Sequence, residues 1–246
     1  MVALLALSGC TMDDEYRPNK SIGTWLWHAT REDIGRVVEI FDLMERYEHY
    51  SRIDDDEALK SEYFATNFVG YTLSIEGNCH RLIYQTNYYS TIVTEISVLG
   101  NNRWHITRSG GNHYDLDLSL RSDGSFLAEF NTLSHDESVG YASFIARRNS
   151  AESSYSIEGE MVMVDTEESR KRPLTLTTNI VMPLVINREY NTLIDGELYI
   201  ECYDKLYNTL DKAFVEVVKN RDDYAPYMAS VYISCYGRID EVGNNL

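Results

Sequence analysis

The sequence is poor in proline, glycine and basic residues. Its 246 residues include 4 prolines and 14 glycines, a composition that argues against a collagen-like or low-complexity stalk. Lys and Arg number 22 against 39 Asp and Glu, which gives a net charge of −17. A surface this acidic repels phosphate backbones, so nucleic acid is not expected as a partner.

Several functional motifs are also missing. After residue 10 no apolar run is long enough for a transmembrane helix. The chain contains no nucleophile elbow, phosphate-binding loop, dinucleotide fingerprint or His-Glu-x-x-His zinc motif. The sequence therefore favours a binding role over catalysis and indicates no cofactor or metal. What it does contain is 43% hydrophobic residues, enough for a substantial core.

The first ten residues form an apolar segment that ends in Leu7-Ser8-Gly9-Cys10. This string resembles the lipobox of bacterial lipoproteins, in which a leucine and two small residues precede an obligatory cysteine. The resemblance implies that residues 1–9 are a signal peptide, truncated at its start, and that the Cys10 sulfur carries a diacylglyceryl group. The alternative is a buried strand with Cys10 as a core thiol, but the acidic residues that follow at once are unusual for one.

Residues 10–28 are expected to form the lipidated cysteine and its tether. Asp13, Asp14 and Glu15 resemble the export signal of Bacteroidetes-type surface lipoproteins, although a solvated acidic tether would have the same composition. The resemblance implies a lipid-anchored protein of the outer membrane that faces the exterior. For the folded domain the sequence resembles no family.

Residues 29–66 are predicted to be helical and to pack on the β unit. Thr30 and Asp33 have the spacing of a capping box. The apolar residues that follow recur at helical spacing and form one stripe, made of Ile34, Val37, Val38, Phe41 and Met44. This pattern predicts a helix over 30–47, and a shorter one is expected over 57–64.

Residues 67–246 have the texture of antiparallel strands. Leu116, Leu118 and Leu120 alternate with polar residues, and a turn leads to a second alternating run from Phe126. Similar runs cover 68–75, 81–86, 89–99, 103–107, 139–146, 155–164, 174–186, 198–203, 213–218 and 228–236. Many short strands with short connections predict a β-sandwich or barrel, so the fold class is mainly β (α+β). Pro183 predicts an edge strand or a bulge in its run.

The best candidate for site chemistry is the set His113, Asp115 and Asp117. Alternating positions of a strand point to one face, so these side chains have the placement to share a ligand, a metal ion or a proton. His105, on the preceding strand, would join them if the register brings it close. The simpler interpretation is a wet polar face opposite Leu116 and Leu118.

Tyrosine is abundant, with 19 residues. Tyr88 with Tyr89, and Tyr224 with Tyr227, are the sets that look most exposed, and exposed aromatic faces suit glycan binding. Tyrosine is also a preferred strand residue, so most of the others are expected to cover half-buried sheet faces.

Two further groups have mainly structural interpretations. The acidic run 54–57 has oxygen ligands for Ca²⁺, but it lacks the spacing of an EF-hand and fits the N-terminus of a helix. Cys79, Cys202 and Cys235 are an odd number, so at least one is unpaired, and the parity of Cys202 and Cys235 predicts buried thiols.

The sequence thus predicts a lipid-anchored cell-envelope protein with a non-catalytic binding or assembly role. Its expected partners are the membrane, through the anchor, and a polysaccharide or an envelope protein. Two other functions stay open: a lipocalin-like carrier of an apolar ligand, and a hydrolase that uses carboxylates such as Asp115 and Asp117.

Overall fold

The computed structural model describes residues 22–50, 71–85, 91–109, 113–135, 138–151, 153–165, 174–219 and 229–246. One helix, α1 (Ile22–Tyr50), precedes all the strands. The strands are β1 (Tyr71–Glu76), β2 (Cys79–Gln85), β3 (Thr91–Gly100), β4 (Arg103–Ser109), β5 (His113–Leu120), β6 (Phe126–His135), β7 (Ser138–Asn149), β8 (Ser154–Asp165), β9 (Leu174–Asn187), β10 (Thr192–Asp204), β11 (Thr209–Lys219), β12 (Ala229–Cys235) and β13 (Arg238–Val242).

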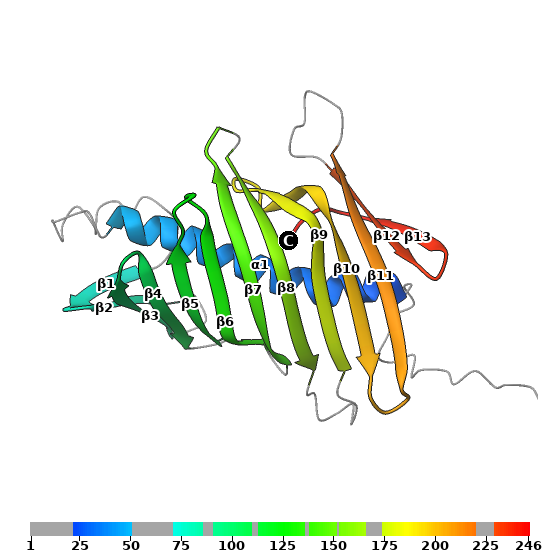
Figure 1. The fold of residues 1–246 in the computed structure, drawn as a ribbon, viewed down its shortest axis with the longest axis horizontal. Coiled ribbons are helices and arrows are strands. Elements are labelled where there is room, and N and C mark those ends of the chain that lie inside the picture. Colours follow the sequence, from blue (N-terminus) through cyan, green and yellow to red (C-terminus); the bar gives the residue numbers. More distant parts are fainter. Residues whose placement is uncertain are drawn as a thin grey trace, which may run out of the picture.

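The strands form one 13-stranded antiparallel sheet whose spatial order is the order of the chain. Figure 1 shows this sheet with α1 lying across the strands. The prediction of a mainly β, α+β fold with an N-terminal helix and a large antiparallel β unit is confirmed. Among the described residues no pairing joins β1 to β13, so the sheet is a single open layer around one helix.

Helix α1 crosses most of the sheet. Near its start, the hydroxyl of Thr24 donates to Asp240 Oδ2 of β13 over 3.1 Å. Farther along, the ring of Phe41 lies 6.0 Å from that of Tyr155 on β8. Glu39 accepts a hydrogen bond of 3.2 Å from Arg108 on β4. The helix therefore ties the two halves of a long meander together, which sequential hairpins alone do not do.

The predicted start of the helix is wrong. Helix α1 begins at Ile22 and not at Thr30, so residues 22–28 belong to the helix and not to the predicted tether. Thr30 is buried inside the helix, because Leu26 and Trp27 before it are already part of the core. The spacing of Thr30 and Asp33 matched a capping box without forming one. The second helix predicted over 57–64 lies outside the described residues.

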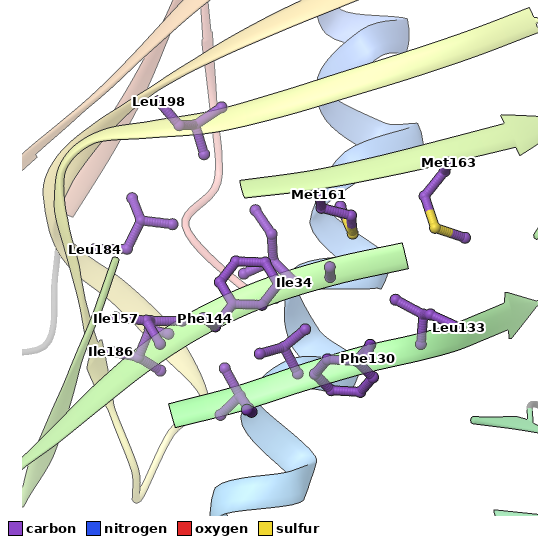
Figure 2. Close-up of a cluster of buried hydrophobic side chains, with 14 of the residues drawn as sticks. Ile34, Phe130, Leu133, Phe144, Ile157, Met161, Met163, Leu184, Ile186 and Leu198 are labelled. Carbon is purple, nitrogen blue, oxygen red and sulfur yellow. The ribbon is translucent and has the colours of Figure 1, made fainter. Parts of the chain in front are cut away.

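The two faces of the sheet differ in character. The inner face, defined here as the face that packs on α1, carries the hydrophobic core, and the outer face is the opposite one. All five predicted stripe residues of the helix are buried in this core. Figure 2 shows inner-face side chains of β6 to β10 gathered around Ile34. Leu116 and Leu118 are buried as predicted, whereas Leu120 is half-buried at the end of β5.

Pro183 lies in β9, between β8 and β10, and not in an edge strand. The pairings on both sides are irregular there: the β8–β9 register shifts between Ile157 and Glu160, and the β9–β10 register shifts between Leu193 and Leu198. A proline removes one donor from the ladder, and a bulge accommodates that loss. The bulge alternative of the prediction is confirmed.

Asp33 is a carboxylate buried beside the core. Arg36 Nη1 donates to its Oδ1 over 2.6 Å, and this ion pair lowers the carboxyl pKa. Burial has the larger and opposite effect, so the pKa of Asp33 is raised from 3.8 to about 6. A carboxyl with a raised folded-state pKa contributes stability that is fully present below pH 3.8 and is lost as the pH rises through 6.

We expect Asp33→Asn to flatten this pH dependence. Between pH 4 and pH 7 the wild-type chain should lose up to about 3 kcal/mol of unfolding free energy relative to the variant. Urea denaturation followed by circular dichroism at several pH values measures the difference. Glu39→Gln, which removes an exposed carboxylate of the same helix that does not act on the pKa of Asp33, is the matched control and should leave the slope unchanged. Parallel pH profiles for wild type and Asp33→Asn would contradict the raised pKa.

Candidate functional site

Several predicted site residues lie outside the described part of the chain. These are Cys10, the tyrosine sets Tyr88 with Tyr89 and Tyr224 with Tyr227, and the acidic run 54–57. The candidate that the structure does describe is the polar face of β5.

The alternation predicted for β5 is present. His113, Asp115 and Asp117 are not buried, while the intervening Tyr114 and Leu116 are buried in the core. The three polar side chains therefore share the outer face, which is the geometry that the sequence indicated.

The register brings His105 of β4 to this face. His105 is the cross-strand partner of Asp117, and Thr107 is the partner of Asp115. His105 Nδ1 lies 3.0 Å from Asp117 Oδ1, and Nε2 lies 3.7 Å from Asp115 Oδ2. One imidazole thus spans both carboxylates. His113, farther along β5 and opposite Ser134, makes none of these contacts.

Asn131 of β6 completes the group on the other side. Its Nδ2 donates to Asp115 Oδ1 over 3.1 Å and to Asp117 Oδ2 over 3.4 Å. Sequence reasoning missed Asn131, because its position depends on an irregularity between β5 and β6. We call His105, Asp115, Asp117 and Asn131 the polar cluster.

These hydrogen bonds set the charge of Asp117. The hydrogen bond with His105 lowers the pKa of the carboxyl most, and the hydrogen bond from Asn131 and the nearby charges of His105 and Arg103 lower it further. Desolvation, the second-largest effect, raises the pKa of Asp117 but does not outweigh the effects that lower it. Asp117 is therefore an ionised acceptor at neutral pH and is unsuited to donate a proton.

A tyrosine lies next to the polar cluster. In the β6–β7 register, Phe130 opposes Ala142 and Leu133 opposes Gly140. Asn131 and Thr132 therefore oppose the single residue Tyr141, which is the geometry of a β-bulge. Tyr141 is on the outer face and is 57% exposed. No sequence signal distinguished it from the other tyrosines, because its exposure follows from the strand parity at the bulge.

The polar cluster does not have the geometry of a metal site. Among the residues that the structure describes, no group of three or more His, Cys, Asp and Glu side chains could hold a metal ion. The shared metal considered for His113, Asp115 and Asp117 is therefore not supported. Each carboxylate of the cluster instead contacts a ring nitrogen and an amide.

The cysteines offer no nucleophile to this site. Cys79, Cys202 and Cys235 are thiols that form no disulfide bond, and Cys202 and Cys235 are buried as predicted. Cys202 lies on β10 and Cys235 on β12, with β11 between them. Two inter-strand spacings amount to roughly 9.6 Å, which is too long for a disulfide bridge without backbone movement.

No helix among the described residues combines the length and the apolar character that a membrane span requires.

No family model, curated protein or solved structure matches the chain. Asp115 and Asp117 offer acceptor oxygens, Asn131 offers both a donor and an acceptor, and Tyr141 offers an aromatic face beside them. This combination suits a neutral ligand that is rich in hydroxyl groups and has apolar C–H faces.

Proposed function

We propose that this chain is a lipid-anchored cell-envelope protein that binds a glycan, without catalysis, on the outer face of β4 to β7. The observation that carries the proposal is the polar cluster beside the exposed ring of Tyr141. Sugar hydroxyls donate to ionised carboxylates, and an aromatic ring stacks on the C–H face of a pyranose. The cluster also satisfies its own hydrogen bonds, so the acceptors are already oriented before a ligand binds.

The anchor rests on the lipobox resemblance of Leu7-Ser8-Gly9-Cys10. Acyl chains on Cys10 would hold the domain on the outer membrane, since each buried CH₂ contributes about 0.8 kcal/mol. We place the domain on the exterior side, where a glycan-binding face meets its ligand.

The filled inner face favours this function over an apolar-ligand carrier. Leu26, Trp27 and Ile34 of α1 are completely buried in the core that the inner strands form. In a carrier, an apolar ligand would occupy the space beside the inner face of the sheet. In this protein the side chains of α1 occupy that space.

The electrostatics favour binding over hydrolysis. Glycoside hydrolysis needs one carboxyl with a raised pKa as the general acid. Hydrogen bonds from His105 and Asn131 have the opposite effect on Asp117. They make this carboxylate a better acceptor and a poorer acid.

The test is glycan binding by the full chain. Soluble xylan, mannan, β-glucan and bacterial O-antigen are the probes, and calorimetry or tyrosine fluorescence measures the affinity. For any probe that binds, Tyr141→Ala and the double variant Asp115→Asn/Asp117→Asn should each weaken affinity at least tenfold. Tyr190→Ala, which removes an exposed tyrosine from the β9–β10 turn, should leave it unchanged.

Two results would contradict glycan binding and favour another function. Release of reducing sugar by the wild type that the double variant abolishes would make the protein a hydrolase. Failure of every probe, together with binding of a purified envelope protein that Tyr141→Ala weakens, would keep the site and change the class of ligand.

A further inference from the structure

A second exposed surface lies at the turn between β10 and β11. It consists of large side chains that are partly or mostly exposed, and we call these residues the apolar tip: Tyr203, Leu206, Tyr207, Leu210 and Tyr236. Leu206 is 59% exposed and Tyr236 is 72% exposed. Single exposed apolar residues are normal, but a contiguous group marks an interaction surface.

The members of the apolar tip are adjacent. Tyr203 and Leu210 are cross-strand partners in the β10–β11 hairpin. The hydroxyl of Tyr236, in the β12–β13 turn, donates to Asp211 Oδ1 over 2.6 Å and lies 3.4 Å from the carbonyl oxygen of Leu210. The tip therefore spans two turns that are distant in sequence.

The β10–β11 turn is held in one conformation. Asp204 Oδ1 accepts hydrogen bonds from the backbone N–H groups of Leu206 and Tyr207, over 2.8 and 3.1 Å. The hydroxyl of Tyr203 donates to Asn208 Oδ1 over 3.1 Å. These contacts hold the turn so that Leu206 and Tyr207 project from it, and little ordering remains to be done when a partner binds.

The apolar tip lies beside the start of α1. Gly23 packs so closely on β12 that an added Cβ would lie 2.7 Å from Cys235 Cβ. Cys235 directly precedes Tyr236 in the sequence. Thr24 is hydrogen-bonded to Asp240 of β13. The chain that connects the folded domain to Cys10 therefore reaches it next to the tip.

The connecting segment is short. Residues 11–21 separate Cys10 from Ile22, and a chain of this length reaches at most roughly 40 Å when fully extended. A lipid on Cys10 would thus keep the end of the domain that carries the tip close to the bilayer.

The charges around the tip nearly cancel, although the chain as a whole is acidic. Its basic neighbours are Lys205, Lys212 and Arg238, and its acidic ones are Glu201, Asp204, Asp211 and Asp240, which leaves one net negative charge. An anionic bilayer therefore repels the tip less than it repels the remaining, more acidic surface of the protein.

We propose that the apolar tip docks on the bilayer that holds the anchor, with Leu206 and Leu210 in the acyl boundary and the tyrosines at the level of the headgroups. Tyrosine favours that interface because its ring is apolar and its hydroxyl is polar. This inference rests on the lipid anchor of the proposed function. Docking would orient the domain, with β7, β8 and β9 separating the tip from the polar cluster.

The test uses the full chain with Cys10→Ala, which cannot be lipidated, so the part of the membrane binding that tip variants remove reports the tip and not the anchor. Vesicles of phosphatidylcholine and phosphatidylglycerol at a four-to-one ratio are sedimented with the protein. We expect a measurable fraction of the protein to bind the vesicles. The single variant Leu206→Asp, or the double variant Leu206→Ser/Tyr236→Ser, should lower this bound fraction at least fivefold. Leu99→Ser/Val181→Ser, which removes two exposed apolar residues elsewhere, should leave the bound fraction unchanged.

Equal binding by the tip variants and the control would overturn the docking inference. So would a dimer in analytical ultracentrifugation that Leu206→Asp converts to monomer, since the tip would then bind a second copy. The intact mass of the wild-type chain from the membrane fraction tests the anchor separately. An acyl mass with no effect of the tip variants refutes docking alone, whereas tip-dependent binding without an acyl mass refutes the anchor alone.

Discussion

Replacing Trp27 with alanine should lower the free energy of unfolding by about 3–5 kcal/mol. Trp27 is completely buried where α1 meets the sheet. Its indole Nε1 has no hydrogen-bond partner, so the expected loss comes from apolar contacts and from the cavity that remains. Urea denaturation followed by circular dichroism measures the change.

Trp25→Ala is the matched control for Trp27→Ala. Trp25 lies on the same helix but is only half-buried, so its removal should have a clearly smaller effect. If the two variants lost equal stability, or if Trp27→Ala lost none, α1 would not form the core of this fold. The inner face of the sheet would then be available to a ligand, and the carrier function would regain support.

The stripe of α1 was predictable because its cause is local. Ile34, Val37 and Phe41 follow the helical period, and that period alone decides which face is buried. The start of the helix was not predictable from the same pattern. Thr30 is a typical N-capping residue and has the spacing of a capping box with Asp33. The tertiary contacts of Leu26 and Trp27, however, extend the helix to the N-terminal side of Thr30.

Strand parity was predictable and strand register was not. The alternation in β5 places Asp115 and Asp117 on one face, whatever their neighbours are. Whether His105 joins them depends on how β4 pairs with β5, and a shift of one residue would turn His105 inward. Asn131 and Tyr141 depend on two bulges, for which the sequence carries no signal comparable to Pro183.

The extent of the sheet also exceeded the prediction. Strand β13 was missed because Arg238, Asp240 and Glu241 leave few apolar residues to alternate. Strand β10 begins before its predicted start, because Gly196 interrupts the pattern between Leu193 and Leu198. Both strands form because a neighbouring strand provides backbone hydrogen-bond partners. The sequence of one strand alone does not reveal whether such a neighbour is present.

The polar cluster and the apolar tip, the two surfaces to which we assign proposed functions, lie in different parts of the sheet. The polar cluster lies on β4 to β6, and the tip lies on β10 to β13 next to the start of the helix. If the proposed anchor holds, a tether that begins next to the tip would present the opposite end of the sheet to the surroundings. The position of α1, whose first turn packs on β12, would then determine which part of the outer face is available for the proposed recognition.

Substitution of Gly159 by alanine should lower the free energy of unfolding by about 4 kcal/mol or more. Gly159 lies in β8 at the irregular pairing near Pro183, with a φ of +147°. An added Cβ would overlap the carbonyl oxygen of Ser143 and would lie 2.9 Å from Phe144 Cα. Both are backbone atoms of β7, so no side chain can move to relieve the overlap.

Gly77→Ala separates the steric overlap from the backbone strain. Gly77 also has a positive φ, of +61°, but an added Cβ would meet nothing within 4 Å. The left-handed conformation alone costs about 1–2 kcal/mol, so Gly77→Ala should lose only that amount in urea denaturation. If Gly159→Ala lost no more than Gly77→Ala, β7 and β8 would have room to separate.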